Sequence, residues 1–172
     1  MRMVLALFAA ALLVACAKSP TAPSNATSPA AAAAQPPGAP VAGVYVANGK
    51  PAVLTDVSIH ADDPIDGKPI HAFVFTVSPQ AGDVDIINDA RQGKLGDAII
   101  VRVDDDGAID GADLVHHGLD KSNGYASTVG VLSIDNYRVT AGEVFGHVTS
   151  GGPSDHDGQQ INVDLTFHTK MP

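Results

Sequence analysis

The sequence is short of cysteine and of basic residues, and both shortages narrow what the protein can be. Cys16 is the one cysteine, so no disulfide can form within the chain and stability must come from packing. The 10 Lys and Arg stand against 19 Asp and Glu, which gives a net charge of −9 at pH 7. Nucleic acid and anionic lipid headgroups are bound by basic patches, so this balance argues against both as partners.

The chain also lacks an apolar run long enough to cross a bilayer. The run Val4–Val14 has about eleven residues, whereas a transmembrane helix needs roughly 20. Arg2 precedes the run and small residues end it, as in a secretory signal peptide. We therefore predict that residues 1–15 are a signal peptide and take no part in the fold.

The end of this run, Leu13-Val14-Ala15-Cys16, resembles the lipobox of bacterial lipoproteins. The resemblance implies that Cys16 is lipidated and becomes the first residue of the mature protein, which two or three acyl chains then hold permanently in the membrane. Ala17, rather than Asp, follows Cys16, which implies the periplasmic face of the outer membrane. Alternatively, Ala15-Cys16-Ala17 is an ordinary signal-peptidase site, and the protein is then soluble in the periplasm or secreted.

Residues 16–40 are predicted to be a disordered linker that begins at the lipidated cysteine. After Cys16 this stretch is almost wholly Ala, Pro, Ser, Thr and Gly, and its run Ala30–Ala34 is too short for an isolated helix. A flexible chain of this length spans roughly 25 to 30 Å. The linker thus separates the membrane from one acidic domain, residues 41–172, which is large enough for a single core.

Period-two alternation predicts that this domain is built from strands. Near the C-terminus Ile161, Val163, Leu165 and Phe167 alternate with polar residues, which is typical of a half-buried strand. A second alternation covers residues 53–60. Further β-rich runs are Val44–Ala47, His71–Val77, Ala98–Val103, Ala108–His116, Thr128–Ile134, Tyr137–Thr140 and Val144–Thr149.

Turn signals separate these runs, and most contain Asp or Asn before Gly. They are Asn48-Gly49, Asp66-Gly67, Asp106-Gly107, Asn123-Gly124 and Gly151-Gly152-Pro153. The clearest hairpin joins 99–103 to 109–115 through Asp106-Gly107. Only Val84–Leu95 is predicted to be helical, and Gly93 limits it to two or three turns. About eight short strands indicate an all-β, antiparallel, immunoglobulin-like sandwich or a small barrel.

Clustered aspartates raise the question of a calcium loop at residues 104–113. Asp104-Asp105-Asp106-Gly107 is followed by Asp110 and Asp113. An EF-hand needs Gly after its third ligand position and a Glu six residues later, and neither is present. We therefore predict a hairpin turn.

Histidines near glycine-rich turns raise the question of a transition-metal site. The candidates are His116, His117, His147 and His156. Adjacent histidines on a strand point to opposite faces, so His116 and His117 share an ion only if the chain has already turned at Gly118. No His-x-His, His-Glu-x-x-His or cysteine partner is present, which also sets aside any similarity to copper-zinc superoxide dismutase. No metal and no cofactor is predicted.

A short serine segment gives no evidence of catalysis. Ser150-Gly151-Gly152-Pro153 resembles the nucleophile segment of trypsin-like proteases over four residues only, and Thr149 precedes it in place of Asp. We expect a turn there, and we expect Tyr125 and Tyr137 to be core or edge residues. No catalytic residue is predicted, and the protein is not expected to be an enzyme.

Two classes of function are compatible with these patterns. The first is a non-catalytic interaction domain that binds an envelope protein; inhibitors and immunity lipoproteins share this layout, and an acidic face suits a basic hydrolase. The second is a small periplasmic enzyme or metal-handling protein that uses Asp104–Asp113 with His116, His117, His147 or His156. Convergence of three or more Asp and His side chains in a concavity would favour the second.

Overall fold

The computed structural model describes residues 39–80, 85–120 and 124–172. The predicted signal peptide, Cys16 and the linker up to residue 38 lie outside the described residues, as do Val84, the first residue of the predicted helix, and Asn123. The predicted domain start coincides with the first strand, which begins at Val41.

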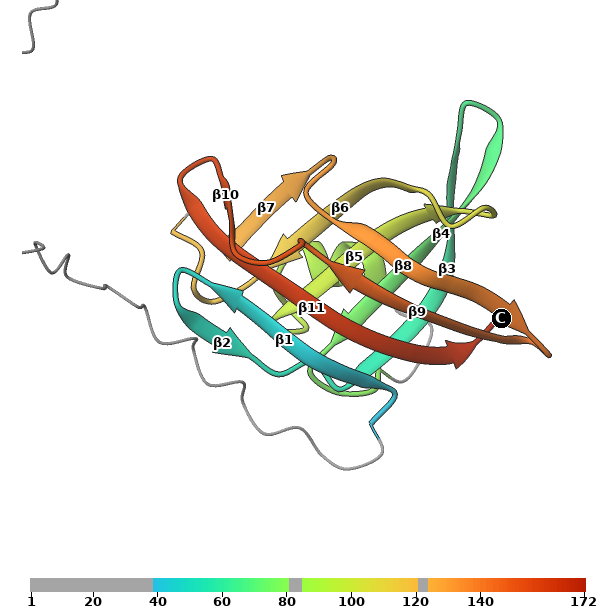
Figure 1. The fold of residues 1–172 in the computed structure, drawn as a ribbon, viewed down its shortest axis with the longest axis horizontal. Helices are drawn as coiled ribbons and strands as arrows, with labels where there is room; N and C mark the ends of the chain where they lie inside the picture. Colours follow the sequence, from blue (N-terminus) through green and yellow to red (C-terminus); the bar gives the residue numbers. More distant parts are fainter. Residues whose placement is uncertain (1–38, 81–84, 121–123) are drawn as a thin grey trace, which may run out of the picture.

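The described residues contain eleven strands and one short helix, whose arrangement is drawn in Figure 1. In chain order they are β1 (Val41–Ala47), β2 (Lys50–Ala52), β3 (Asp56–Ile65), β4 (Lys68–Thr76), α1 (Ile86–Arg91), β5 (Ala98–Asp104), β6 (Ile109–Val115), β7 (Tyr125–Thr128), β8 (Ser133–Thr140), β9 (Glu143–Thr149), β10 (Ser154–His156) and β11 (Gln159–Lys170).

The strands form two antiparallel sheets that pack face to face. Sheet A has the order β2-β1-β11-β9-β8, with β10 also paired to β11, and sheet B has the order β3-β4-β5-β6-β7. The all-β sandwich is thereby confirmed, and the sheets do not close into the alternative small barrel. Like an immunoglobulin domain, the molecule is two packed antiparallel sheets; within sheet B, however, the strands simply follow one another as a meander.

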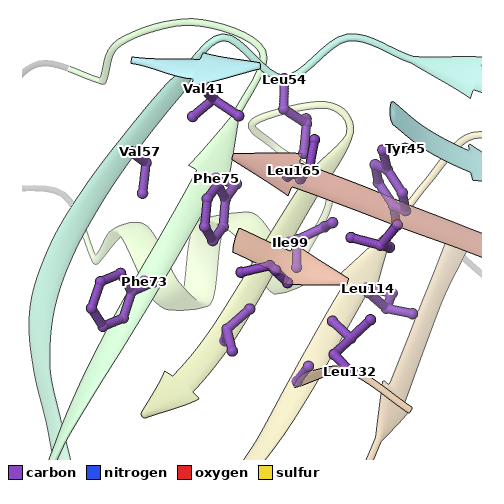
Figure 2. Packing of buried hydrophobic residues seen from close by; sticks show 14 of the residues in the cluster. Val41, Tyr45, Leu54, Val57, Phe73, Phe75, Ile99, Leu114, Leu132 and Leu165 are labelled. Carbon is purple, nitrogen blue, oxygen red and sulfur yellow. The ribbon is translucent and has the colours of Figure 1, made fainter. Parts of the chain in front are cut away.

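The core lies between the sheets. β11 contributes to it the inward residues that the alternation predicted. Ile161, Val163, Leu165 and Phe167 are all buried. The Phe167 ring meets the rings of Phe73 and Phe75 edge-on, at centroid distances of 5.6 and 5.3 Å. Figure 2 shows Phe73 and Phe75 of β4 among Val57, Ile99 and Leu165. Burial of one such side chain stabilises the fold by roughly 1.5 to 3 kcal/mol.

A second, smaller apolar cluster covers the outer face of sheet B. Ile86 and Ala90 of α1 pack there against Ala72, Val74 and Ile100, so β4 and β5 are buried on both faces. The helix is shorter than the predicted 84–95. The Asp85 side chain caps its start by accepting from the Asn88 backbone N–H, and Gly93, with φ of +71°, follows its end.

The chain differs from the predicted strands in several places, and the short strands β2 and β10 were not predicted at all. Residues 128–134 are not one strand, because β7 ends at Thr128 and β8 starts at Ser133, with Gly130 at φ +75° between them. The alternation over 53–60 becomes a strand only from Asp56, and the residues before it carry the chain from sheet A to sheet B, with Leu54 buried. The turns at Asn48-Gly49 and Asp66-Gly67 are confirmed, since all four residues have positive φ.

Candidate functional site

Asp104-Asp105-Asp106-Gly107 forms the predicted hairpin turn between β5 and β6. Asp104 Oδ1 accepts from the backbone N–H groups of Asp106 (3.0 Å) and Ala108 (2.9 Å). These hydrogen bonds, the one from Ala108 foremost, hold the pKa of Asp104 below its usual value. A side chain on Gly107 would put its Cβ 2.5 Å from the Tyr137 ring. Both oxygens of Asp104 therefore have protein partners, because Oδ2 lies 3.5 Å from Lys68 Nζ.

Asp113 lies outside that turn, on the outer face of sheet B, where it fastens the helix. Its side chain is 1% exposed and its Oδ2 accepts from Arg91 Nε (2.8 Å) and Arg102 Nη2 (3.3 Å). Tyr125 donates to Oδ1 at 2.8 Å. Burial alone would raise the pKa of Asp113, but hydrogen bonds from Tyr125 and Arg91 outweigh it and hold the pKa below normal. Asp113 therefore has a structural role.

Two of the four candidate histidines lie apart from the others. His147, on the outer face of sheet A, has Nε2 2.7 Å from Asp164 and Nδ1 3.7 Å from Asp135. His156 in β10 has Nε2 3.3 Å from the Ser127 carbonyl oxygen. Ser150 lies in a turn, as predicted, where its hydroxyl donates to the Gly152 carbonyl at 2.7 Å.

The remaining pair converges with an aspartate that sequence reasoning missed. Asp97, His116 and His117 each offer a potential ligand atom, and these atoms lie within 4.8 Å of one another. The strand predicted to reach His116 ends at Val115, so both histidines lie in the following turn and their rings stack at 4.5 Å. The predicted hairpin could have identified Asp97. Ala98 pairs with Val115, so extending the pairing by one residue places Asp97 beside His116.

His116 is fully buried, at 0% exposure. Its ring meets Tyr45 edge-on at 4.6 Å, and the Gly118 backbone N–H donates to its Nδ1 at 2.8 Å. The ring proton of the neutral form therefore lies on Nε2, which has no hydrogen-bond partner among the described residues. Burial lowers the pKa of His116 to about 4.

His117 is half exposed, at 54% of its side chain. Asp97 holds it twice: Oδ1 accepts from the His117 backbone N–H at 2.7 Å, and Oδ2 lies 2.8 Å from Nδ1. The three side chains border a hollow of about 330 Å³, whose other walls are Gly93, Gly96, Val115, Leu119 and Gly124.

A second candidate surface is the outer face of sheet A, where the strand pairing places Arg138, Phe145 and His168 in one row. The Arg138 guanidinium lies 4.4 Å from the centre of the Phe145 ring, and the His168 ring stacks on the other side at 6.1 Å and 19°. The row borders a shallow hollow of about 400 Å³ that also contacts Pro40, His147 and Thr166. The described helix packs on sheet B alone.

Comparison with known proteins gives no relative: no family model, curated protein or solved structure matches the chain. In the described part of the chain, no helix has the length and apolar character to span a membrane.

Proposed function

We propose that the chain is a lipid-anchored envelope protein whose sandwich is a non-catalytic binding domain, and that the outer face of sheet A binds a basic envelope protein. The single observation that carries the binding role is the row Arg138, Phe145 and His168, which lies beside a hollow on the face that α1 does not cover. Arginine and aromatic side chains are the residue types that carry most binding energy in protein interfaces.

The charge of the domain favours a basic partner. Asp135 and Asp164 flank the row, and their side chains are 59% and 64% exposed. The net charge of −9 adds long-range attraction for a cationic protein. An apolar side chain of the partner would enter the hollow and stack on Phe145, while its Lys or Arg residues would meet the two aspartates. Such an interface forms faster at low salt.

Site-specific photo-crosslinking in cells tests the binding face. A photoreactive phenylalanine analogue replaces Phe145 in one full-length chain and Val129 in a matched control. Val129 is 79% exposed in the β7–β8 turn. We expect position 145 to give a discrete adduct with a basic protein, identified by mass spectrometry, and position 129 to give none. The same adduct from both positions, or none from 145, would refute the proposal.

Membrane attachment tests the anchor separately. Cys16→Ala is expected to abolish palmitate labelling and to move the protein from the membrane fraction to the soluble fraction. Ser24→Ala, in the linker, is the matched control and keeps both. A wild-type chain that is already soluble and unlabelled would rule out the anchor while leaving the binding face untouched.

A further inference from the structure

We propose that Asp97, His116 and His117 form a binding site for a divalent transition-metal ion, with Zn²⁺ as its simplest occupant. This site is separate from the binding face on sheet A and goes beyond the proposed function. Its three converging Asp and His side chains beside a hollow are the arrangement that favours the alternative, a metal-handling protein. Two imidazoles and one carboxylate are typical zinc ligands and leave a fourth position for water or another group.

The fold brings two of the ligands together before any ion binds. The antiparallel pairing of Ala98 with Val115 places Asp97 and His116 side by side at one end of sheet B. The three ligand atoms lie within 4.8 Å of one another. Around a tetrahedral ion, donors about 2.0 to 2.2 Å from the metal are roughly 3.3 to 3.5 Å apart. Because the widest separation is no more than 4.8 Å, binding needs a contraction of at most about 1.5 Å.

His116 is the fixed ligand of the three. Burial and edge-on contact with Tyr45 hold its ring, and the hydrogen bond from Gly118 places the free electron pair on Nδ1. A metal ion at Nδ1 would replace that hydrogen bond and leave the Nε2 proton in place. In most metal-bound histidines the other ring nitrogen keeps its proton and donates it to a carboxylate, a carbonyl or water; Nε2 of His116 has no such acceptor among the described residues.

His117 is the ligand that must rotate. Its ring is nearly parallel to that of His116, at 22°, and electron pairs in the planes of parallel rings cannot meet at one ion. The exposed His117 side chain can rotate away from the His116 ring. This rotation breaks the contact between the Asp97 carboxylate and Nδ1 of His117. The hydrogen-bonded arrangement is thus the metal-free state of a site that closes when both groups take the ion.

Zn²⁺ titration of the full chain by calorimetry tests the site, with Co²⁺ as a spectroscopic probe. We expect 1:1 binding that Asp97→Asn and His117→Ala each weaken at least tenfold. His147→Ala is the matched control, because it removes a histidine that also pairs with aspartates, and it should leave the affinity unchanged. Bound Co²⁺ should give visible absorption that the first two variants lose. Both substitutions change exposed or partly exposed side chains, so we expect both variants to fold.

Three results would overturn the site. They are no Zn²⁺ binding by the wild-type chain, wild-type affinity in both Asp97→Asn and His117→Ala, or loss of binding in His147→Ala. Circular dichroism of each variant shows whether a lost affinity reflects lost folding. If His117→Ala is unfolded, Asp97→Asn alone decides, because asparagine retains an oxygen that can accept from the His117 backbone N–H.

Discussion

The outer faces of both sheets carry arginine, aromatic and aspartate side chains, but these are buried or partly buried on sheet B and more exposed on sheet A. On sheet B, Arg91, Arg102 and Tyr125 surround a carboxylate that is 1% exposed, and a helix covers the apolar residues beside it. On sheet A, Arg138 and His168 flank Phe145 on a face where the carboxylates are more than half exposed. On sheet B arginine and tyrosine side chains thus bind a buried carboxylate, whereas on sheet A arginine lies against an aromatic ring on a face that remains available for contact. The predictions below test this difference.

Loss of the buried carboxylate should have the largest effect on stability. Asp113→Ala removes the partner of two guanidinium groups and a phenol, and we expect it to lower the free energy of unfolding by about 3 to 5 kcal/mol. Asp164→Ala removes an exposed carboxylate that pairs with His147, and the expected loss is at most about 1 kcal/mol. Urea denaturation of both variants measures the contrast. Equal losses would show that the two faces do not differ as described.

As the pH falls, the free energy of unfolding should decrease first because of His116 and, at lower pH, because of Asp113. The unfolded chain protonates His116 near its usual pKa of 6.5, whereas the folded chain does so at about 4. Stability therefore falls by about 3 kcal/mol as the pH falls from 6.5 to 4, because the unfolded state binds the proton first. Below the ordinary Asp value of 3.8, the lowered pKa of Asp113 adds a further loss of the same sign.

Unfolding free energies measured between pH 8 and pH 3 test this order. His116→Gln should flatten the curve between pH 6.5 and 4 and leave the lower limb in place. A curve of unchanged slope in this variant would contradict the assignment.

Two neighbouring residues of β9 should differ because they face opposite sides of sheet A. A Cβ on Gly146 would lie 2.7 Å from the Phe167 ring, so Gly146→Ala should cost about 1 to 3 kcal/mol through overpacking. Adding Phe167→Leu should restore part of that loss. Phe145→Ala changes the outer face and should cost less than Gly146→Ala, as measured by thermal unfolding. A greater loss from Phe145→Ala would mean that its ring supports the fold.

Local patterns were enough to predict most of the longer strands and several turns, because alternation and Asn-Gly or Asp-Gly pairs act within a few residues; the short strands β2 and β10 were not predicted. The alternation of β11 identified its inward face, and two predicted turns have the expected positive φ at both residues. The turn at Asp157-Gly158, with φ of 53° and 77°, carries the same signal and was not predicted. The Asp-Gly pair marks this turn, but the strand before it, β10, has only three residues. So short a strand shows no alternation that would identify a hairpin.

The candidate surfaces depend on register between strands, which local patterns do not contain. The row on sheet A requires Arg138 to pair with Phe145, and this follows an irregularity in β8 between Asp135 and Arg138, where Asn136 has φ of 56°. Nothing in the spacing of these residues reveals that shift. Asp97 was within reach of the predicted hairpin, because the pairing needs only one further step toward His116.

The pairing of β1 with β11 also determines when the fold can be completed. All five strands of sheet B have been synthesised once the chain reaches Thr128, whereas the central pair of sheet A joins Val41 to Phe167. Such long-range pairing is slow to form. A chain that emerges with its N-terminus first can assemble the meander early, but β1 can pair only with β2 until β11 has been synthesised. Premature termination before Ile161 would therefore leave β1 without any of its pairs to β11.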